Sequence, residues 1–148
     1  MPRTALSAVV LVALAAGCGG GNGSERLSRN AYLARADAIC RDVDEKRKTL
    51  PVPAAIPDIP AYVDRALPIL DEARSRLEAL RPPSSLDDQV SGWLSAIRDG
   101  RDALSDLRSA AAKGDVAKVR AVGSTSTGIA DRARTSARAI GLVDCANS

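Results

Sequence analysis

The three cysteines of this chain have the widest choice of chemistry, and they stand at positions 18, 40 and 145 of 148. A thiol can be modified covalently, join a second thiol in a disulfide, or act as a nucleophile beside a base. The chain contains no histidine, and Met1 is its only methionine. Without imidazole, and with no thioether beyond that of Met1, we expect no cofactor such as haem, no histidine-built metal site and no Cys-His or Ser-His nucleophile pair. Any catalysis would have to rest on carboxylates, lysine, arginine, serine or tyrosine alone.

The first 18 residues have the pattern of an export signal. Arg3 places a positive charge before an uncharged run at residues 5–16. That run has the length of a signal sequence and is shorter than the roughly 20 residues that a membrane-spanning helix needs. The small residues Ala16 and Gly17 come directly before Cys18, and they allow the chain to lie extended in a peptidase groove.

The LAAGC sequence at residues 14–18 resembles the lipobox of bacterial lipoproteins, with the leucine one position further from the cysteine than is usual in that family. The resemblance implies that residues 1–17 are a signal peptide, and that Cys18 is lipidated and becomes the first residue of the mature chain. The alternatives are an ordinary signal peptide cleaved near Ala16 and an N-terminal helix with a buried cysteine. A lipidated Cys18 would have the lipid bilayer as its partner. We therefore expect an exported protein on the outer face of the cell membrane, or a periplasmic or outer-membrane protein in a cell with two membranes.

The segment after Cys18 is rich in glycine and lacks large side chains that could pack. Residues 18–27 are therefore predicted to be the lipidated cysteine and a flexible tether. Residues 28–148 form about 120 residues of ordinary globular composition, the size of one small domain.

With Cys18 assigned to the lipid, Cys40 and Cys145 remain as a pair. An exported chain meets an oxidising space, so a disulfide between them is expected, the alternative being two buried thiols. The disulfide would close a loop of about 100 residues and stabilise the fold by about 4 to 5 kcal/mol in the chain-entropy model. The sequences ADAIC at 36–40 and GLVDC at 141–145 resemble those of small uncharacterised helical lipoproteins, which have no established activity to transfer.

Four segments with apolar residues at helical spacing must position these groups. They span about 28–50, 58–81, 84–112 and 115–140, with proline-rich or glycine-containing turns between them. Ser28, Ser84-Ser85 and Asp115 are predicted N-caps, and Gly141 closes the last segment. The pattern predicts an all-α protein, an antiparallel up-down-up-down four-helix bundle. In that topology Cys145 reaches Cys40 only if the tail folds back along the bundle.

Trp93, Gly100 and Ser126 are the candidate ligand-binding residues. Trp93 is the only tryptophan, while Gly100 and the hydroxyl run at 124–127 would leave space in the interhelical seam. The simpler interpretation of each is packing, as a core tryptophan and a close helix crossing. A cavity above roughly 300 Å³ lined by Trp93 and the hydroxyl run would favour ligand binding, whereas a filled core would favour an interaction module.

The charged residues point to a solvated surface. Acidic doublets such as Asp71-Glu72 diverge by about 100° on a helix and do not converge on one site. Arg132, Arg134 and Arg138 likewise scatter around their helix, so a dedicated anion site is not expected there. The formal net charge is +3, with both signs interspersed, which argues against nucleic-acid binding.

These features favour a non-catalytic interaction or binding module of the cell envelope, with an envelope protein as a candidate partner. The alternative is a carrier of a small apolar or amphiphilic ligand held between the helices. An envelope hydrolase is disfavoured, because the chain lacks a nucleophile-base pair.

Overall fold

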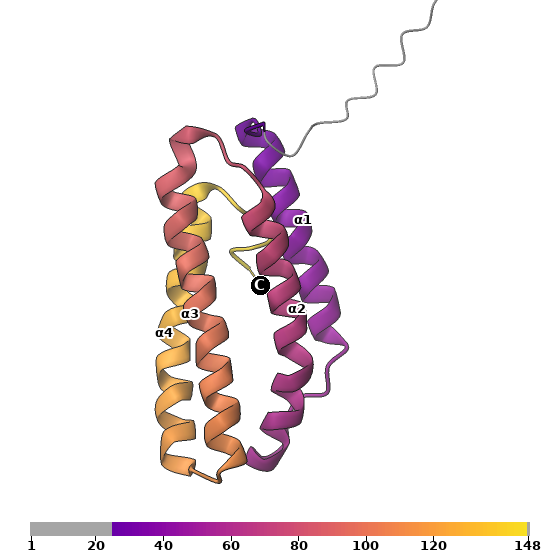
Figure 1. The fold of residues 1–148 in the computed structure, drawn as a ribbon, viewed down its shortest axis with the longest axis vertical. Helices are drawn as coiled ribbons and strands as arrows, with labels where there is room; N and C mark the ends of the chain where they lie inside the picture. Colours follow the sequence, from indigo (N-terminus) through magenta and orange to yellow (C-terminus); the bar gives the residue numbers. More distant parts are fainter. Residues whose placement is uncertain (1–24, 148) are drawn as a thin grey trace, which may run out of the picture.

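The computed structural model describes residues 25–147, and in this part of the chain all regular structure is helical (Figure 1). The all-α class expected from the sequence is thus confirmed for these residues. The expected signal peptide (1–17), Cys18 and the tether as far as residue 24 lie outside the described residues. The four α-helices are α1 (Arg29–Lys48), α2 (Ile59–Ala79), α3 (Asp87–Ala112) and α4 (Val116–Ile140), with short 3-10 turns η1 (Ile56–Asp58) and η2 (Ser84–Leu86) before α2 and α3.

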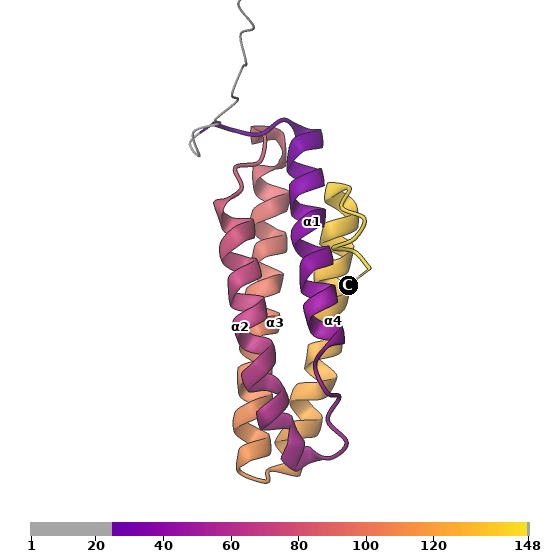
Figure 2. The ribbon, with the colours of Figure 1, turned by 90° about the vertical axis from the view of Figure 1, so that its right-hand side faces the viewer.

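The four helices lie side by side along the long axis of the molecule (Figures 1 and 2). Neighbours in the sequence pack against one another, and the contact between α3 and α4 is the most extensive. Within residues 25–147, no helix combines the length and the apolar character that crossing a membrane requires.

Three of the predicted helix ends are confirmed. The side chain of Ser28 accepts a hydrogen bond from the Ala31 amide at 3.3 Å, and Asp115 accepts one from the Lys118 amide at 2.9 Å. Each satisfies an amide that the first helical turn leaves without a partner. At the end of α4, Gly141 has a φ of 99°, a left-handed conformation that favours glycine.

The start of α3 differs from its prediction. Ser84 and Ser85 do not cap the helix but form the turn η2, in which the Leu86 amide donates to the Pro83 carbonyl at 2.9 Å. In the described part of the chain, no side chain caps the start of α3 at Asp87. The buried side chain of Leu86 anchors the turn in the core, so tertiary packing replaces the local serine cap.

The main core lies where the start of α1, the end of α4 and the C-terminal tail come together. Tyr32 and Ala36 of α1, Trp93 of α3 and Ile140 of α4 are buried there together with Leu142 of the C-terminal tail. The tail is therefore part of the core and not a loose end.

The opposite end is built differently, because the helices are unequal in length. α1 has 20 residues, whereas α3 has 26 and α4 has 25. At 1.5 Å per residue, α1 is about 9 Å shorter than α3. The proline-containing segment 49–58 covers the remaining distance to α2 (Figure 2), and this segment cannot fill the interior as a helix would.

Candidate ligand-binding cavity

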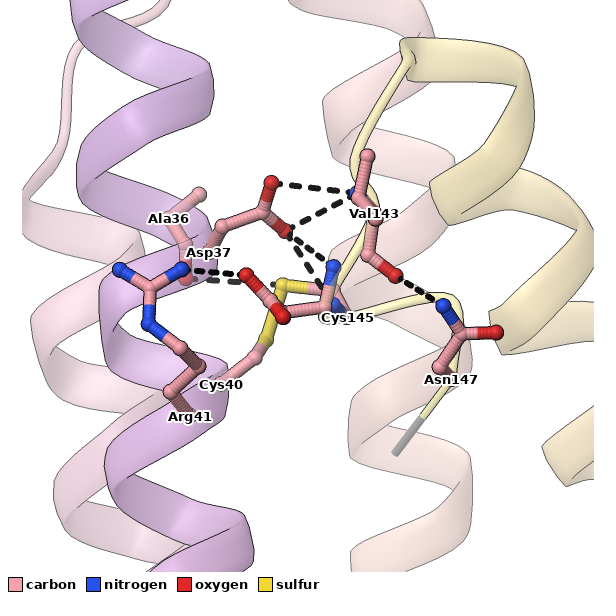
Figure 3. Close-up of polar contacts among 8 residues, drawn as sticks. Ala36, Asp37, Cys40, Arg41, Val143, Cys145 and Asn147 are labelled. Atoms are coloured by element: carbon pink, nitrogen blue, oxygen red, sulfur yellow. Dashed lines mark hydrogen bonds and ion pairs between the residues drawn. A yellow bond between two sulfur atoms is a disulfide. The ribbon is translucent and has the colours of Figure 1, made fainter.

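The C-terminal tail is held against α1 by the carboxylate of Asp37 (Figure 3). Asp37 is the one charged side chain among the buried residues of the described chain. Its oxygens accept hydrogen bonds from the amides of Val143 at 3.1 Å, Asp144 at 3.0 Å and Cys145 at 3.2 Å. A buried carboxylate needs such donors to replace its lost hydration, so the burial of Asp37 depends on the tail.

The disulfide between Cys40 and Cys145 is the second tie between tail and helix. The Cα atoms of the two residues lie 5.1 Å apart, and 105 positions separate them in the sequence. As expected, the tail folds back along the bundle, and Figure 3 shows Val143 and Cys145 of the tail beside α1. Arg41 of α1 adds a surface ion pair with Asp144.

Next to the disulfide, whose two cysteines form part of its wall, a cavity of about 350 Å³ lies between the four helices. This volume falls in the range of small-molecule sites, about 300 to 1,000 Å³. Its wall is mainly apolar, with contributions from every helix. The apolar side chains are those of Val43, Ala66, Leu70, Ala73, Leu77, Trp93, Ala96, Ile97, Leu104, Ile129, Ala130 and Ala133.

The structure brings the three candidate residues together on this wall. Trp93 is almost fully buried and also belongs to the main core, so its indole joins core and cavity. At Gly100 a side-chain methyl would lie 3.6 Å from a methyl carbon of Ile129, so the glycine leaves space that alanine would occupy without a clash. The hydroxyl of Ser126 donates to the Val122 carbonyl at 2.8 Å. Ser126 therefore offers lone pairs, but not its proton, to a ligand.

The other hydroxyls of the run 124–127 do not line the cavity. Thr125 and Thr127 are exposed, and their hydroxyls donate to the carbonyls four residues earlier in α4. They bond to their own helix and leave Ser126 as the one member of the run on the cavity wall.

Four arginines line the cavity, and each comes from a different helix. They are Arg47 of α1, Arg74 of α2, Arg101 of α3 and Arg134 of α4. Among the described residues, no Asp or Glu lines the cavity. The expectation that the arginines of α4 diverge agrees with the structure, in which Arg132 instead pairs with Asp99 of α3 at 3.2 Å.

The acidic doublet Asp71-Glu72 lies in ion pairs on the surface. Asp71 accepts from Arg101 at 3.1 Å and raises the pKa of that guanidinium through the hydrogen bond. Its neighbour Glu72 contacts Lys46 at 3.0 Å. In residues 25–147 no group of three or more acidic, histidine or cysteine residues could hold a metal ion.

Tyr32 is a buried polar group without a function in this cavity. Its hydroxyl is fully buried and has no hydrogen-bond partner among the described residues. Burial raises the pKa of Tyr32 to about 12, because the phenolate would lose its hydration.

Two features of the site were missed by the sequence analysis. Asp37 was given no role, although an acid beside the buried stripe of Tyr32, Ala36 and Ile39 is a signal for a buried polar contact. The four arginines were not connected, because they lie in four separate segments of the chain. Comparison with protein-family models, curated proteins and solved structures finds no match for this chain.

Proposed function

We propose that this protein binds a small apolar or amphiphilic ligand in the cavity between its helices, as a non-catalytic carrier or binding module of the cell envelope. The observation that carries the proposal is the cavity of about 350 Å³ lined by Trp93, Gly100 and Ser126. A packed core would have favoured a pure interaction module. Binding without catalysis is the simpler role, since the chain has no histidine to activate a hydroxyl or thiol.

We also propose the antiparallel up-down-up-down bundle as the topology around the cavity. Ion pairs between helices support it. Asp42 of α1 pairs with Arg76 of α2, and Lys46, one turn later in α1, pairs with Glu72, one turn earlier in α2. This order is the one expected for two antiparallel helices. The turn between α3 and α4 is tight and contains Gly114 with a φ of 67°, as expected for adjacent antiparallel helices.

Membrane attachment through lipidated Cys18 completes the proposal. A tethered binding domain would receive or deliver its ligand close to the lipid bilayer. The support is the lipobox-like sequence at 14–18 and the glycine-rich segment after it. Cys18→Ser should abolish partitioning of the full chain into a detergent phase, because only that thiol can accept the lipid, and mass spectrometry should show an uncleaved, unmodified precursor. A diacylglycerol mass on this variant would contradict the proposal.

Ligand binding can be tested with Trp93 as a built-in reporter, because it is the only tryptophan. Bromoundecanol, a neutral amphiphile with a bromine at the end of its chain, should quench the fluorescence of Trp93 in the folded full-length protein and saturate. Bromine quenches at contact distance, so saturable quenching requires the alkyl chain to reach the cavity wall. The same titration of the chain unfolded in urea is the control. The absence of saturable quenching with both neutral and charged amphiphiles would refute the proposed function.

A further inference from the structure

The four cavity-lining arginines lie close together along the axis of the molecule. Lys46, the residue before Arg47, contacts Glu72 at 3.0 Å. Asp71, the residue before Glu72, contacts Arg101 at 3.1 Å. These contacts place Arg47 and Arg101 at nearly the same level on facing sides of the cavity.

The other two arginines lie within a short distance of that level. Arg74 is three residues, about one turn, from Asp71 on α2. On α4, the pair between Arg132 and Asp99 places Arg134 about one turn from the level of Arg101. The backbone positions of all four arginines therefore belong to one layer of roughly 10 Å.

Three of these arginines already have carboxylate partners. Arg74 contacts Glu78 at 3.2 Å, Arg101 contacts Asp71, and Arg134 contacts Asp131 at 3.0 Å. The Nε of Arg74 is nevertheless buried and has no hydrogen-bond partner among the described residues. The layer thus keeps donor capacity that its own carboxylates do not use.

Arg47 differs from the other three. No ion pair of its guanidinium occurs within the described part of the chain. Asp44, the acid one turn earlier on α1, pairs with Lys48 at 2.8 Å; that hydrogen bond is the main cause that lowers the pKa of Asp44, and the charge of Arg47 contributes less. Arg47 follows Cys40 by seven positions and Val43 by four, and all three line the cavity. This spacing places Arg47 on the stripe of α1 that lines the cavity, near the C-terminal end of the helix, where its side chain is also exposed to solvent.

The cavity therefore combines an apolar wall with a layer of arginines and, among residues 25–147, no lining carboxylate. An apolar ligand would leave the donors of that layer unused, and a small anion would leave the apolar wall empty. Building on the proposed cavity function, we propose that the ligand is a single-chain amphiphile with an anionic head group. Arg47 binds the head group, and the alkyl chain lies along the wall towards Trp93.

The test compares two probes that differ only in the head group. Bromoundecanoate and bromoundecanol share the brominated chain, and both are titrated against the full-length protein near neutral pH while Trp93 quenching is followed. We expect the carboxylate to bind about tenfold more tightly than the alcohol, because a guanidinium hydrogen-bonds a carboxylate in a charge-assisted geometry. Added salt should narrow the difference, since the arginine layer is partly open to solvent.

Arg47→Ala should remove most of the preference for the carboxylate and leave binding of the alcohol unchanged. Arg35→Ala is the matched control, because Arg35 is an exposed residue of the same helix that does not line the cavity. Arg47→Lys should retain part of the preference, since it keeps the charge but not the planar fork. Circular-dichroism melting checks that each variant is folded.

The outcomes separate the two proposals. Equal affinity of the wild-type chain for both probes would overturn the anionic ligand and leave the cavity function standing. If Arg47→Ala and Arg35→Ala reduced the preference for the carboxylate probe equally, the role of Arg47 would be overturned, because the change in net charge alone would explain the reduction. Failure of both probes to quench Trp93 would overturn the cavity function itself.

Discussion

At the scale of single residues, two buried polar side chains of α1 differ in whether their hydrogen-bonding groups have partners. The carboxylate of Asp37 is surrounded by three backbone amides of the tail, whereas the hydroxyl of Tyr32 has no partner among the described residues. An unsatisfied buried hydroxyl costs about 1 to 3 kcal/mol, while a satisfied carboxylate can hold two segments together. The first is a defect that can be removed, and the second is a structural requirement.

Tyr32→Phe should leave the free energy of unfolding at neutral pH unchanged or raise it by about 1 kcal/mol, because it removes the unsatisfied hydroxyl. The alkaline behaviour should also change. Burial raises the pKa of Tyr32 from 10.0 to about 12, so below pH 10 the hydroxyl is protonated in both states, and between pH 10 and 12 its ionisation in the unfolded chain destabilises the folded state. Between pH 10 and 12 the free energy of unfolding of the wild-type chain should therefore fall by roughly 2 to 3 kcal/mol more than that of Tyr32→Phe.

Urea unfolding of both proteins between neutral pH and pH 12 measures this difference. Tyr62→Phe makes the same chemical change at the only other tyrosine and serves as the control. Parallel alkaline curves for the wild type and Tyr32→Phe would show that the Tyr32 hydroxyl is solvated.

At the scale of elements, the C-terminal tail acts as a fifth packing segment beside α1. The Asp37 hydrogen bonds and the Cys40–Cys145 disulfide hold the same few residues, and Leu142 and Ala146 bury their side chains in the core. The tail also closes the cavity at the end near Trp93, since Cys145 lies on the cavity wall. Stability and the shape of the site therefore depend on the same tail.

Reduction of the disulfide should lower the melting temperature by more than about 5 °C.

Asp37→Asn should lower the free energy of unfolding by about 1 to 3 kcal/mol, because three amides then share one neutral oxygen. Since both changes release the same tail, their combined effect should be smaller than the sum. Thermal scans with and without reductant test this, with Asp44→Asn on the same helix as the control. A melting temperature that does not respond to reductant would contradict the prediction.

The centre of α4 should be the most mobile helical stretch. A Cβ atom added at Gly123 or Gly128 would have no neighbouring atom of the described residues within 4 Å, so this stretch packs loosely. The hydroxyls of Thr125 and Thr127 bond back to their own helix. Local opening follows the density of buried contacts. Amide hydrogen exchange should therefore be fastest, among helical segments, across 123–128 and slowest across 93–107 of α3. Equal protection of the two segments would rule out α4 as the opening element.

At the scale of the whole molecule, the cavity lies beside the C-terminal half of α1. Cys40, Val43 and Arg47 line it from α1, and small residues face it from the other three helices, among them Ala66, Gly100 and Ala133. α1 is also about 9 Å shorter than α3, and the proline-rich segment 49–58 continues the chain in its place. A void of this size reduces stability, so filling it should trade binding for stability.

Ser126→Leu should raise the free energy of unfolding by about 1 kcal/mol, because the larger side chain fills part of the cavity. The same change should weaken quenching of Trp93 by the brominated amphiphiles. Ser124→Leu places the same residue on an exposed position of α4 and is the matched control. Unchanged ligand affinity in Ser126→Leu would mean that the ligand binds elsewhere.

The sequence by itself determined the four helices, the ends at Ser28, Asp115 and Gly141, and the pairing of Cys40 with Cys145. Helices follow from contacts three and four residues apart and from caps next to them, so the necessary information is local. The helix starting at Asp87 was placed too early, because Leu86 is anchored by the core and not by its neighbours in the chain. The cysteine pairing needed only the number of cysteines and the expected oxidising compartment.

Only the tertiary structure decided the site. Trp93, Gly100 and Ser126 were candidates on separate grounds, and their position on one cavity wall depends on how α3 and α4 pack. The arginine layer takes one residue from each helix, so no spacing within a segment could reveal it. Asp37 finds its partners more than 100 residues away in the tail. Such contacts depend on the register between segments, which a single helical pattern leaves undetermined.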